Sequence, residues 1–357
     1  MDERFQQICA WLERLPFLAG HEYSQPVAAS SDASFRRYFR IRLARPFIEQ
    51  SSDALGYHND SLIIMDAPPQ HEDCRPFIGV ACTLAELGLN VPKILAQDLS
   101  QGFLLLSDLG TETYLSQLIP QQESRAESLY GGALSALVKL QRAGGPASQQ
   151  LPAYDAALLH REMDLFSDWL GEKHLQIGLN KLQKGQWTEI KQVLIESALA
   201  QPQTFVHRDY HSRNLMLAPG LNPGVIDFQD AVRGGLTYDA VSLLRDCYIA
   251  WPPEQVQEWL RAYFLQLCAA QVVDTSQWSD FVKAFDLMGI QRHLKASGIF
   301  ARLSHRDGKD GYLNDIPQTL NYIVQVGAKY PQMKPLLDWI EKDWLVRLHA
   351  LPAASQP

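Results

Sequence analysis

The hydrophobic positions in the first third of the chain follow the patterns of β-strands. In SFRRYFRIRL, Phe39, Ile41 and Leu43 alternate with arginines, which is the period of a half-buried strand. SLIIMDAPP is a short apolar run stopped by prolines, and KILAQDLSQGFLLLSDLG predicts two strands joined by a turn at residues 100–102. We therefore expect a β-sheet in this part of the chain.

Helical spacing interrupts this sheet and dominates the rest of the chain. MDERFQQICAWLERLPFLAG predicts an amphipathic helix, and RPFIGVACTLAELG predicts a helix that ends at Gly88. Another helix is expected over residues 124–143, where the sequence GGP should end it. Periodic apolar segments then predict helices at residues 160–170, 187–200, 238–249, 254–272, 278–288, 291–303, 317–327 and 336–351.

This order of elements predicts an α+β protein with two lobes. We expect an N-terminal lobe over residues 1–108, formed by a β-sheet with one helix, and a larger, mainly helical C-terminal lobe over residues 109–357. A chain of 357 residues exceeds the usual size of a single hydrophobic core, which agrees with two lobes. A ligand-binding cleft is expected where the lobes meet.

Composition and charge narrow the class of partner. The chain is 46% hydrophobic and 20% charged, as in globular proteins, and its net charge of −8 comes without a long basic run. We therefore expect a small-molecule substrate and neither nucleic acid nor membrane as a partner. The five cysteines are scattered, which suits a reducing compartment, and the N-terminus lacks the layout of a signal peptide. We expect a cytoplasmic monomer.

The stretch FVHRDYHSRNLML carries the strongest chemical signal. His207, Asp209 and Asn214 match H-x-D-x-x-x-x-N, the catalytic-loop spacing of protein-kinase-like phosphotransferases. Thirteen residues after Asn214, Asp227 ends the apolar run of VIDFQD, and the intervening APGLNPG is rich in turn formers. The sequence therefore predicts a hairpin that carries Asn214 and Asp227 on neighbouring strands.

These residue types suit phosphoryl transfer. A carboxylate beside the acceptor hydroxyl can accept its proton, which is the role we expect for Asp209, although an aspartate at this spacing can also only cap a turn. Mg²⁺ takes a few protein oxygens together with phosphate oxygens and water, which suits Asn214 and Asp227. We expect His207 to orient the loop by hydrogen bonding. Asp239 is expected to start a helix or to brace a loop.

Longer stretches add a resemblance. FVHRDYHSRNLML followed by GVIDFQDAVRGGLTYDAVSLLRD resembles the aminoglycoside phosphotransferase and choline kinase group of the protein-kinase-like superfamily. SSDASFRRYFRI, LIIMDAPP, GFLLLSDLG and GIFARLSHRDGKDGYLNDIP resemble, more narrowly, the bacterial anomeric kinases of N-acetylmuramate and N-acetylglucosamine. The resemblance runs from about residue 27 to about residue 325.

This resemblance implies a fold and an activity. It implies a protein-kinase-like two-lobe fold, ATP and Mg²⁺ as cofactors, Asp209 as the base, and Asn214 and Asp227 as metal ligands. It also implies that the C1 hydroxyl of an amino sugar is phosphorylated during peptidoglycan recycling. The adenine should then contact the backbone at Ser107, Asp108 and Leu109, where the lobes join.

The phosphate-binding part departs from the usual kinase pattern. A glycine-rich loop is missing, and Met65 stands where a strand lysine would hold the phosphates; the first lysine of the chain is Lys93. We expect the loop ASSDASFRRYF to take over this role, although its arginines can equally be solvent-facing residues of an edge strand. The expected nucleotide contacts on it are Ser31, Ser34, Phe35, Arg36 and Arg37, with Arg40 and Arg42 on the strand that follows.

The acceptor site is defined less sharply. His211 and Arg213 in the catalytic loop, and Asp230 after it, are candidates for substrate contacts. N-acetylmuramate carries a carboxylate, so Arg306 is a candidate to bind it, in a predicted loop that also holds Arg302, His305 and Lys309. The alternative is that this segment is only a solvated connection.

Other functions remain open at this point. The chain can be another small-molecule hydroxyl kinase of the group, of aminoglycoside, choline or homoserine type. It can also be a nucleotide-binding pseudokinase, which the missing lysine would favour. The presence of Asp209, Asn214 and Asp227 argues for an active enzyme, because these are the groups that must touch the acceptor and the metal.

Overall fold

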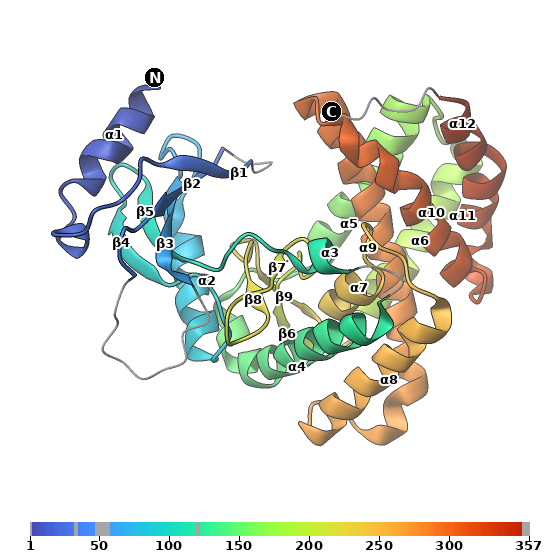
Figure 1. Cartoon of the computed structure of the whole chain (residues 1–357). Coiled ribbons are helices and arrows are strands. Elements are labelled where there is room, and N and C mark those ends of the chain that lie inside the picture. Colours follow the sequence, from blue (N-terminus) through green and yellow to red (C-terminus); the bar gives the residue numbers. More distant parts are fainter. Residues whose placement is uncertain (1, 32–34, 47–57, 119–121, 352–357) are drawn as a thin grey trace. The chain divides into compact units, whose positions relative to one another are not determined.

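A computed structural model gives the structure of residues 2–31, 35–46, 58–118 and 122–351 (Figure 1). Residue contacts divide the chain into two units. Unit 1 consists of Met1–Ala136 and Arg213–Asp230, and unit 2 consists of Leu137–Ser212 and Ala231–Pro357. The boundary between the units therefore falls within the stretch FVHRDYHSRNLML: its residues up to Ser212 belong to unit 2, and those from Arg213 onward belong to unit 1. The predicted lobe boundary at Asp108 stays a prediction.

Unit 1 contains an antiparallel sheet that confirms the predicted strands. Within the described residues the strand order is β1-β2-β3-β5-β4. The strands are β1 Val27–Ser31, β2 Arg37–Arg42, β3 His58–Asp66, β4 Ile94–Asp98 and β5 Phe103–Asp108. Arg40 of β2 pairs with Ile63 of β3, which pairs with Leu106 of β5, so these three residues lie side by side. The predicted hairpin turn at residues 100–102 joins β4 to β5.

One face of this sheet packs against a helix, and the other face contributes residues to a pocket. Helix α1, Glu3–Leu12, packs on one face, where Ile8 and Trp11 meet Ile41, Ile64 and other apolar side chains (Figure 1). This burial of an amphipathic face stabilises both elements. Helix α2, Cys74–Glu86, belongs to the other side and confirms the predicted helix, with Gly88 just beyond its end. Side chains alternate in a strand, so the residues between those of the α1 core are left to line a pocket.

The rest of unit 1 includes a small hairpin and part of a long helix. Strands β7, Leu215–Met216, and β8, Gly224–Val225, pair with each other, and α3, Tyr114–Gln117, precedes the long helix. That helix, α4, spans Glu123–Ala147 and continues into unit 2. The prediction that GGP ends it was wrong. Gly144 allows the helix to approach Phe205, whose Cβ would lie 2.9 Å from an added Cβ, so a packing contact outweighs the weak helix propensity.

Unit 2 is mainly helical and completes the predicted α+β class. It also holds the antiparallel pair β6, Gln203–Val206, and β9, Val232–Gly235. Its helices are α5 Ala156–Leu165, α6 Lys181–Leu199, α7 Tyr238–Leu244, α8 Pro253–Ala269, α9 Trp278–Asp307, α10 Ile316–Gly327, α11 Lys334–Trp339 and α12 Leu345–Ala350. π-helical turns extend α5 over Phe166–Leu175 and join α11 to α12 over Ile340–Trp344.

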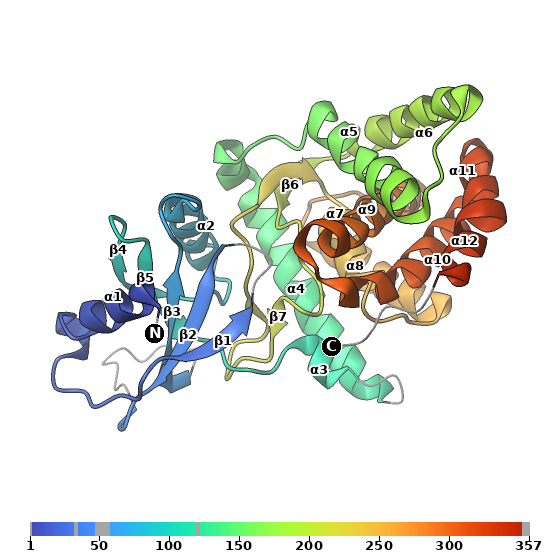
Figure 2. The ribbon, with the colours of Figure 1, turned by 90° about the horizontal axis from the view of Figure 1, so that it is seen from above.

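Helix α9 differs most from its prediction. The sequence predicted two helices, 278–288 and 291–303, followed by a loop, but α9 runs unbroken from Trp278 to Asp307. Its middle is buried against α5, α7 and α10 (Figure 2), so tertiary packing outweighs the weak helix propensity of Gly289 and Gly298. Arg302, His305 and Arg306 therefore lie on the last turns of a helix, and the predicted loop begins only at Gly308.

The closest approach of α9 to its neighbours gives a stability test. A Cβ added at Gly298 would lie 2.3 Å from the backbone carbon of Leu165, where α5 ends. Because backbone cannot move aside, Gly298→Ala should lower the free energy of unfolding by about 2 to 3 kcal/mol, measured by urea denaturation. The control is Gly185→Ala in α6, which has open space and should stabilise the protein by about 0.5 to 1 kcal/mol. Similar effects at both positions would contradict the packing.

Candidate active site

The hairpin of β7 and β8 brings Asn214 and Asp227 together in unit 1. The N–H of Ile226 donates to the carbonyl oxygen of Asn214 at 3.1 Å, and Asn214 Nδ2 donates to Asp227 Oδ2 at 3.1 Å. Asp227 has a φ of 64°, a left-handed conformation that is uncommon for residues other than glycine. Such strain is typical of functional positions, and the predicted hairpin is confirmed.

The oxygens around Asp227 fit a divalent metal ion. The carboxylate of Asp227 and the amide oxygen of Asn214 are hard donors, and Gln229 Nε2 donates to Asp227 Oδ1 at 2.7 Å. The amide oxygen of Gln229 is buried and has no hydrogen-bond partner among the described residues. In the described part of the chain, no group of three or more His, Cys, Asp or Glu side chains is arranged so that it could hold a metal ion. A metal held here would thus complete its shell with phosphate or water oxygens, as Mg²⁺ does.

A pocket of about 400 Å³ lies beside this pair, wholly within unit 1. Its apolar walls include Ile63 and Leu106 of the sheet and Met216 and Ile226 of the hairpin. The lining also contains the following residues named from the sequence: Ser107, Asp108, Leu109, Arg213, Asn214 and Asp227. The expected adenine-binding backbone and the expected metal ligands therefore share one pocket, of a size that suits a small ligand.

Arg40 and Asp108 form the main ion pair of this pocket. Arg40 Nε lies 2.5 Å from Asp108 Oδ2, and its Nη2 donates to Oδ1 at 3.0 Å and to the carbonyl oxygen of Gly110 at 2.9 Å. Ser61 donates a further hydrogen bond to the carboxylate at 2.8 Å. Burial opposes ionisation of Asp108, but Arg40 and the other donors outweigh it and lower the pKa of this carboxyl.

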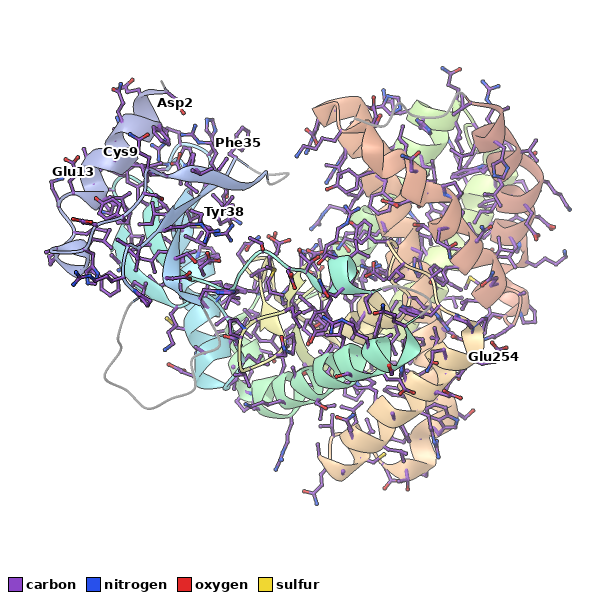
Figure 3. All side chains as sticks on the ribbon, viewed as in Figure 1. Asp2, Cys9, Glu13, Phe35, Tyr38 and Glu254 are labelled. Atoms are coloured by element: carbon purple, nitrogen blue, oxygen red, sulfur yellow. The ribbon has the colours of Figure 1, made fainter. Side chains whose placement is uncertain are left out.

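The two arginines predicted to hold phosphate have other partners. Arg37 Nη2 lies 2.6 Å from Asp66 Oδ2 and also binds Asp2, which Figure 3 labels at the start of α1. Arg36 pairs with Glu72 at 2.9 Å. Neither arginine is among the residues that line the pocket, whereas Arg40 and Arg213 are.

The remaining loop residues give little support for a phosphate cradle. Phe35, labelled in Figure 3, is 64% exposed and stacks on His71 at 4.5 Å. Ser34 lies outside the described residues, and the backbone of Ser31 pairs with Arg37 at the end of β1. Met65 is fully buried, so the strand position of the usual lysine is apolar in the structure as in the sequence.

In unit 2, two buried carboxylates hold the loop that carries Asp209. Asp239 accepts the N–H groups of His207 at 2.7 Å and of Arg208 at 3.0 Å. Asp246 accepts the N–H and the hydroxyl of Ser212 at 2.9 and 2.5 Å. Asp239 lies in the first turn of α7 and Asp246 lies just after the end of this helix, so one short segment holds both ends of the loop. The loop-bracing role predicted for Asp239 is confirmed, and burial raises its pKa to about 7.

A charged cluster around Glu162 supports the residue before Asp209. Arg208 has a φ of 78°, and its guanidinium binds Glu162, which is buried in α5. Lys295 Nζ of α9 lies 3.2 Å from Glu162 Oε1 and donates to the hydroxyl of Tyr238 at 3.0 Å. The hydroxyl of Tyr154 also donates to Glu162. This cluster holds Arg208 in its left-handed conformation, which in turn directs the next residue.

The same cluster sets the charge of Asp209. Burial opposes ionisation of this carboxyl, but the positive charges of Lys295, His211 and Arg208 outweigh burial and lower its pKa. The N–H of Asp209 donates to His207 Nδ1 at 3.3 Å, which fits the orienting role predicted for His207. Asp209 is therefore ionised at neutral pH and only partly exposed.

The predicted acceptor residues have different surroundings. The ring of His211 is buried and meets Tyr248 edge to face at 5.3 Å in unit 2. Arg213 and Asp230 belong to unit 1, and both are exposed. Arg306 is exposed on α9, where its Nε and Nη2 donate to Asp307 at 2.8 and 2.9 Å. The structure therefore does not gather these four residues within one unit.

Comparison with known proteins decides the family. Residues 27–273 match the phosphotransferase enzyme family. The chain belongs to this family. It is also 46% identical to the N-acetylmuramate/N-acetylglucosamine kinase of Pseudomonas aeruginosa, over 94% of this chain and 95% of that protein. The kinase of the same name from Neisseria meningitidis is 40% identical, over 86% of this chain and 87% of that protein.

Solved structures confirm the fold of this phosphotransferase. The Plasmodium vivax ethanolamine kinase aligns with a TM-score of 0.58 at 9% identity, over 87% of this chain and 85% of that one. The GDP complex of aminoglycoside 2'-phosphotransferase-IIIa aligns with a TM-score of 0.56 at 11% identity, over 92% of this chain and 99% of that one. The predicted protein-kinase-like fold is thus confirmed, and as a member of its family the chain is an enzyme that transfers phosphoryl groups.

Several supporting residues of the phosphotransferase were missed by the sequence reasoning. Lys295 follows Arg292 and His293 in a segment predicted to be helical, and Asp246 follows Asp239 by seven residues across a mainly apolar helix, so both left only a weak signal. Glu162 left none, because its partners come from distant parts of the chain.

In the described part of the chain, no helix is long and apolar enough to cross a membrane.

The Arg40–Asp108 pair of this phosphotransferase gives a pH-dependent test. Arg40→Met should lower the free energy of unfolding by about 3 kcal/mol at pH 7, because Asp108 is left buried without its cation. Since the pKa of Asp108 is lowered by folding, this stabilisation is present above the unfolded-state pKa of about 3.9 and is lost as the pH falls through the folded-state pKa.

Urea unfolding at several pH values measures this effect. The loss caused by Arg40→Met should shrink below about pH 4, where Asp108 becomes protonated in the variant and in the unfolded chain. Arg42→Met is the matched control, because Arg42 is exposed on the same strand and should change little. A loss that is the same at pH 7 and pH 3 would show that Arg40 acts through packing instead of charge.

Proposed function

We propose that this chain is an ATP-dependent kinase that phosphorylates the anomeric (C1) hydroxyl of N-acetylmuramate or N-acetylglucosamine, as part of peptidoglycan recycling. The observation that carries this proposal is the 46% and 40% identity to kinases named for these two sugars, across most of the chain. The arrangement around Asp209, Asn214 and Asp227 supports it at the level of residues.

Asp209 is the proposed general base. Its lowered pKa keeps it ionised at neutral pH, so it can hydrogen-bond to the sugar hydroxyl and accept its proton. The hydroxyl oxygen then bonds to the γ-phosphorus of ATP as the bond to the β–γ bridging oxygen breaks and ADP leaves. The loop that presents it is braced by Asp239 and Asp246, which limits the positions that its carboxylate can adopt. Such positioning is the main contribution that a protein makes to phosphoryl transfer.

The base and the proposed metal ligands belong to different units but to one short stretch of chain. Asn214 follows Asp209 by five residues, so their Cα atoms are at most about 18 Å apart by chain length alone. The bracing of residues 207–212 shortens the free part of this connection further. The proposal that Asp209 and Asn214 act together therefore rests on the H-x-D-x-x-x-x-N motif that contains both residues.

ATP is proposed to occupy the unit 1 pocket. The adenine would lie between the sheet and the β7–β8 hairpin, with its polar edge at the backbone of Ser107 and Leu109. Asn214 and Asp227 would hold Mg²⁺, which when bound neutralises the charge of the phosphate oxygens. Arg40 and Arg213, which line the pocket, are the proposed cations in place of the missing strand lysine.

Two wider expectations stay predictions. The chain is expected to act as a monomer in the cytoplasm, where ATP is available. Sedimentation at micromolar protein concentration would test whether the chain is a monomer. A dimer that loses activity on dilution would contradict this expectation. The small-molecule acceptor follows from the names of the relatives.

The transfer reaction itself tests the proposal. Purified protein with ATP and Mg²⁺ should phosphorylate N-acetylmuramate and N-acetylglucosamine but not choline, homoserine or an aminoglycoside, and phosphorus NMR should show a phosphate on C1. Asp209→Asn should lower kcat by about 10² to 10⁴ while leaving ATP binding unchanged, because a general base contributes in that range. Asp280→Asn, an exposed carboxylate far along the chain, is the control.

Two outcomes would contradict this proposal. Phosphate on a hydroxyl other than C1 would keep the kinase and overturn the position of transfer. A wild-type protein that binds ATP yet transfers phosphate to none of these acceptors would favour the pseudokinase alternative.

The metal assignment has its own test. Asn214→Leu removes an oxygen donor and should raise the Mg²⁺ concentration needed for half-maximal rate at least about tenfold. Asn214→Asp keeps an oxygen donor and should need much less additional Mg²⁺. Rates are measured across a Mg²⁺ titration at saturating ATP. Equal Mg²⁺ requirements for both variants and the wild type would exclude Asn214 as a metal ligand.

A further inference from the structure

One face of α9 carries a row of polar residues toward the charged cluster of Glu162. Lys295 and Arg302 are seven residues apart, which places them on the same side of the helix about two turns, or 10.5 Å, from each other. Gln291 begins this row, and its Nε2 donates to the hydroxyl of Tyr154 at 3.2 Å. The row therefore starts at Tyr154, whose hydroxyl donates to Glu162.

A close contact at Gly298 determines how this part of α9 is positioned along α5. It lies between Lys295 and Arg302, where an added Cβ would meet the backbone of Leu165 at 2.3 to 2.4 Å. Glu162 lies one turn before Leu165 in α5. Helix α9 is therefore held in register with α5, with Lys295 one turn before this contact and Arg302 one turn after it.

The charges in this region do not balance. Glu162 is already shared by Arg208 and Lys295, and Asp307 is bound by Arg306. Arg302 is half-buried, its Nε is buried without a hydrogen-bond partner, and it makes no ion pair within the described residues. Burial and the charge of Arg306 lower the pKa of Arg302 more than Asp307 and Glu162 raise it. A cation is thus left without compensation.

A partly buried, unpaired guanidinium is unfavourable unless an anion reaches it. Such an arginine is suited to a planar carboxylate, which it can bind through two parallel hydrogen bonds. Of the two sugars in the proposed function, N-acetylmuramate carries a carboxylate on its lactyl ether and N-acetylglucosamine does not. The two-turn distance from Lys295 to Arg302 is comparable with the span of one substituted monosaccharide.

We propose that Arg302 binds the carboxylate of the acceptor sugar and so determines the preference for N-acetylmuramate over N-acetylglucosamine. This inference rests on the proposed function and deepens it. Arg306, the candidate from the sequence, is exposed and bound to its neighbour Asp307, so it contributes little to this recognition. Arg302 is a binding residue, and the chemical step on C1 does not require it.

The test compares both sugars in wild type and Arg302→Met. For N-acetylmuramate, kcat/KM should fall about 10- to 100-fold, mostly through KM, because a charge-assisted contact made equally in the ground and transition states is lost. For N-acetylglucosamine, kcat/KM should stay within about threefold. Arg306→Met, four residues further along α9, is the matched control and should leave both sugars nearly unchanged.

Arg302→Lys keeps the inference testable if the methionine variant does not fold. It retains the charge but not the paired hydrogen bonds, so it should show an intermediate loss for N-acetylmuramate alone. Thermal melting with and without ATP reports whether each variant is folded.

The outcomes separate this inference from the proposed function. Equal losses on both sugars would overturn it and place Arg302 in a step common to both, such as contact with phosphate. No loss on either sugar, or a larger loss in Arg306→Met, would also overturn it. A wild-type protein that phosphorylates neither sugar would refute the proposed function, and with it this inference, before any variant is compared.

Discussion

The contact between the carboxylate of Asp239 and the N–H groups of His207 and Arg208 is the constraint on which the rest of the site depends. A peptide N–H buried without an acceptor is costly, so this carboxylate determines how the chain turns as it leaves β6. The turn places Arg208 in a left-handed conformation, and Asp209 follows it directly. Asp246 repeats the arrangement at Ser212, so the ends of α7 hold both ends of the loop.

Charge compensation then extends this constraint to other helices. Arg208 would be costly to bury alone, and Glu162 of α5 supplies its partner; Lys295 of α9 supplies a second cation to the same carboxylate. The close approach at Gly298 keeps α9 and α5 in register so that these contacts can form. The proposed base therefore takes its ionised state partly from its own loop, through His211 and Arg208, and partly from Lys295 of α9, which is far away in sequence. Arg302, the proposed carboxylate ligand, continues the row that contains Lys295.

In the unit 1 pocket that is proposed to hold ATP, buried charges are also compensated by partners from other strands. The strand position usually held by a lysine is the buried Met65. The arginines that line the pocket are Arg213 and Arg40, and Arg40 lies on the strand next to Met65 and is held by Asp108. Arg36 and Arg37 turn instead to Glu72, Asp66 and Asp2, where they stabilise the edge of the sheet against α1 and α2. A planar guanidinium can bind a carboxylate and a carbonyl at once, as Arg40 does, which an ammonium on a flexible stem does less well.

The sequence alone determined the features that depend on short stretches of chain. The alternation in β2, the turn between β4 and β5, and the hairpin between Asn214 and Asp227 involve residues at most about fourteen positions apart, so local spacing is enough to predict them. Only the tertiary structure decided which arginines line the pocket, that α4 and α9 continue past their glycines, and that Glu162 and Lys295 support the loop of Asp209. These outcomes depend on desolvation and on partners from distant segments, and the free energy of a buried ion pair or a close helix contact is not encoded in the spacing of any single stretch.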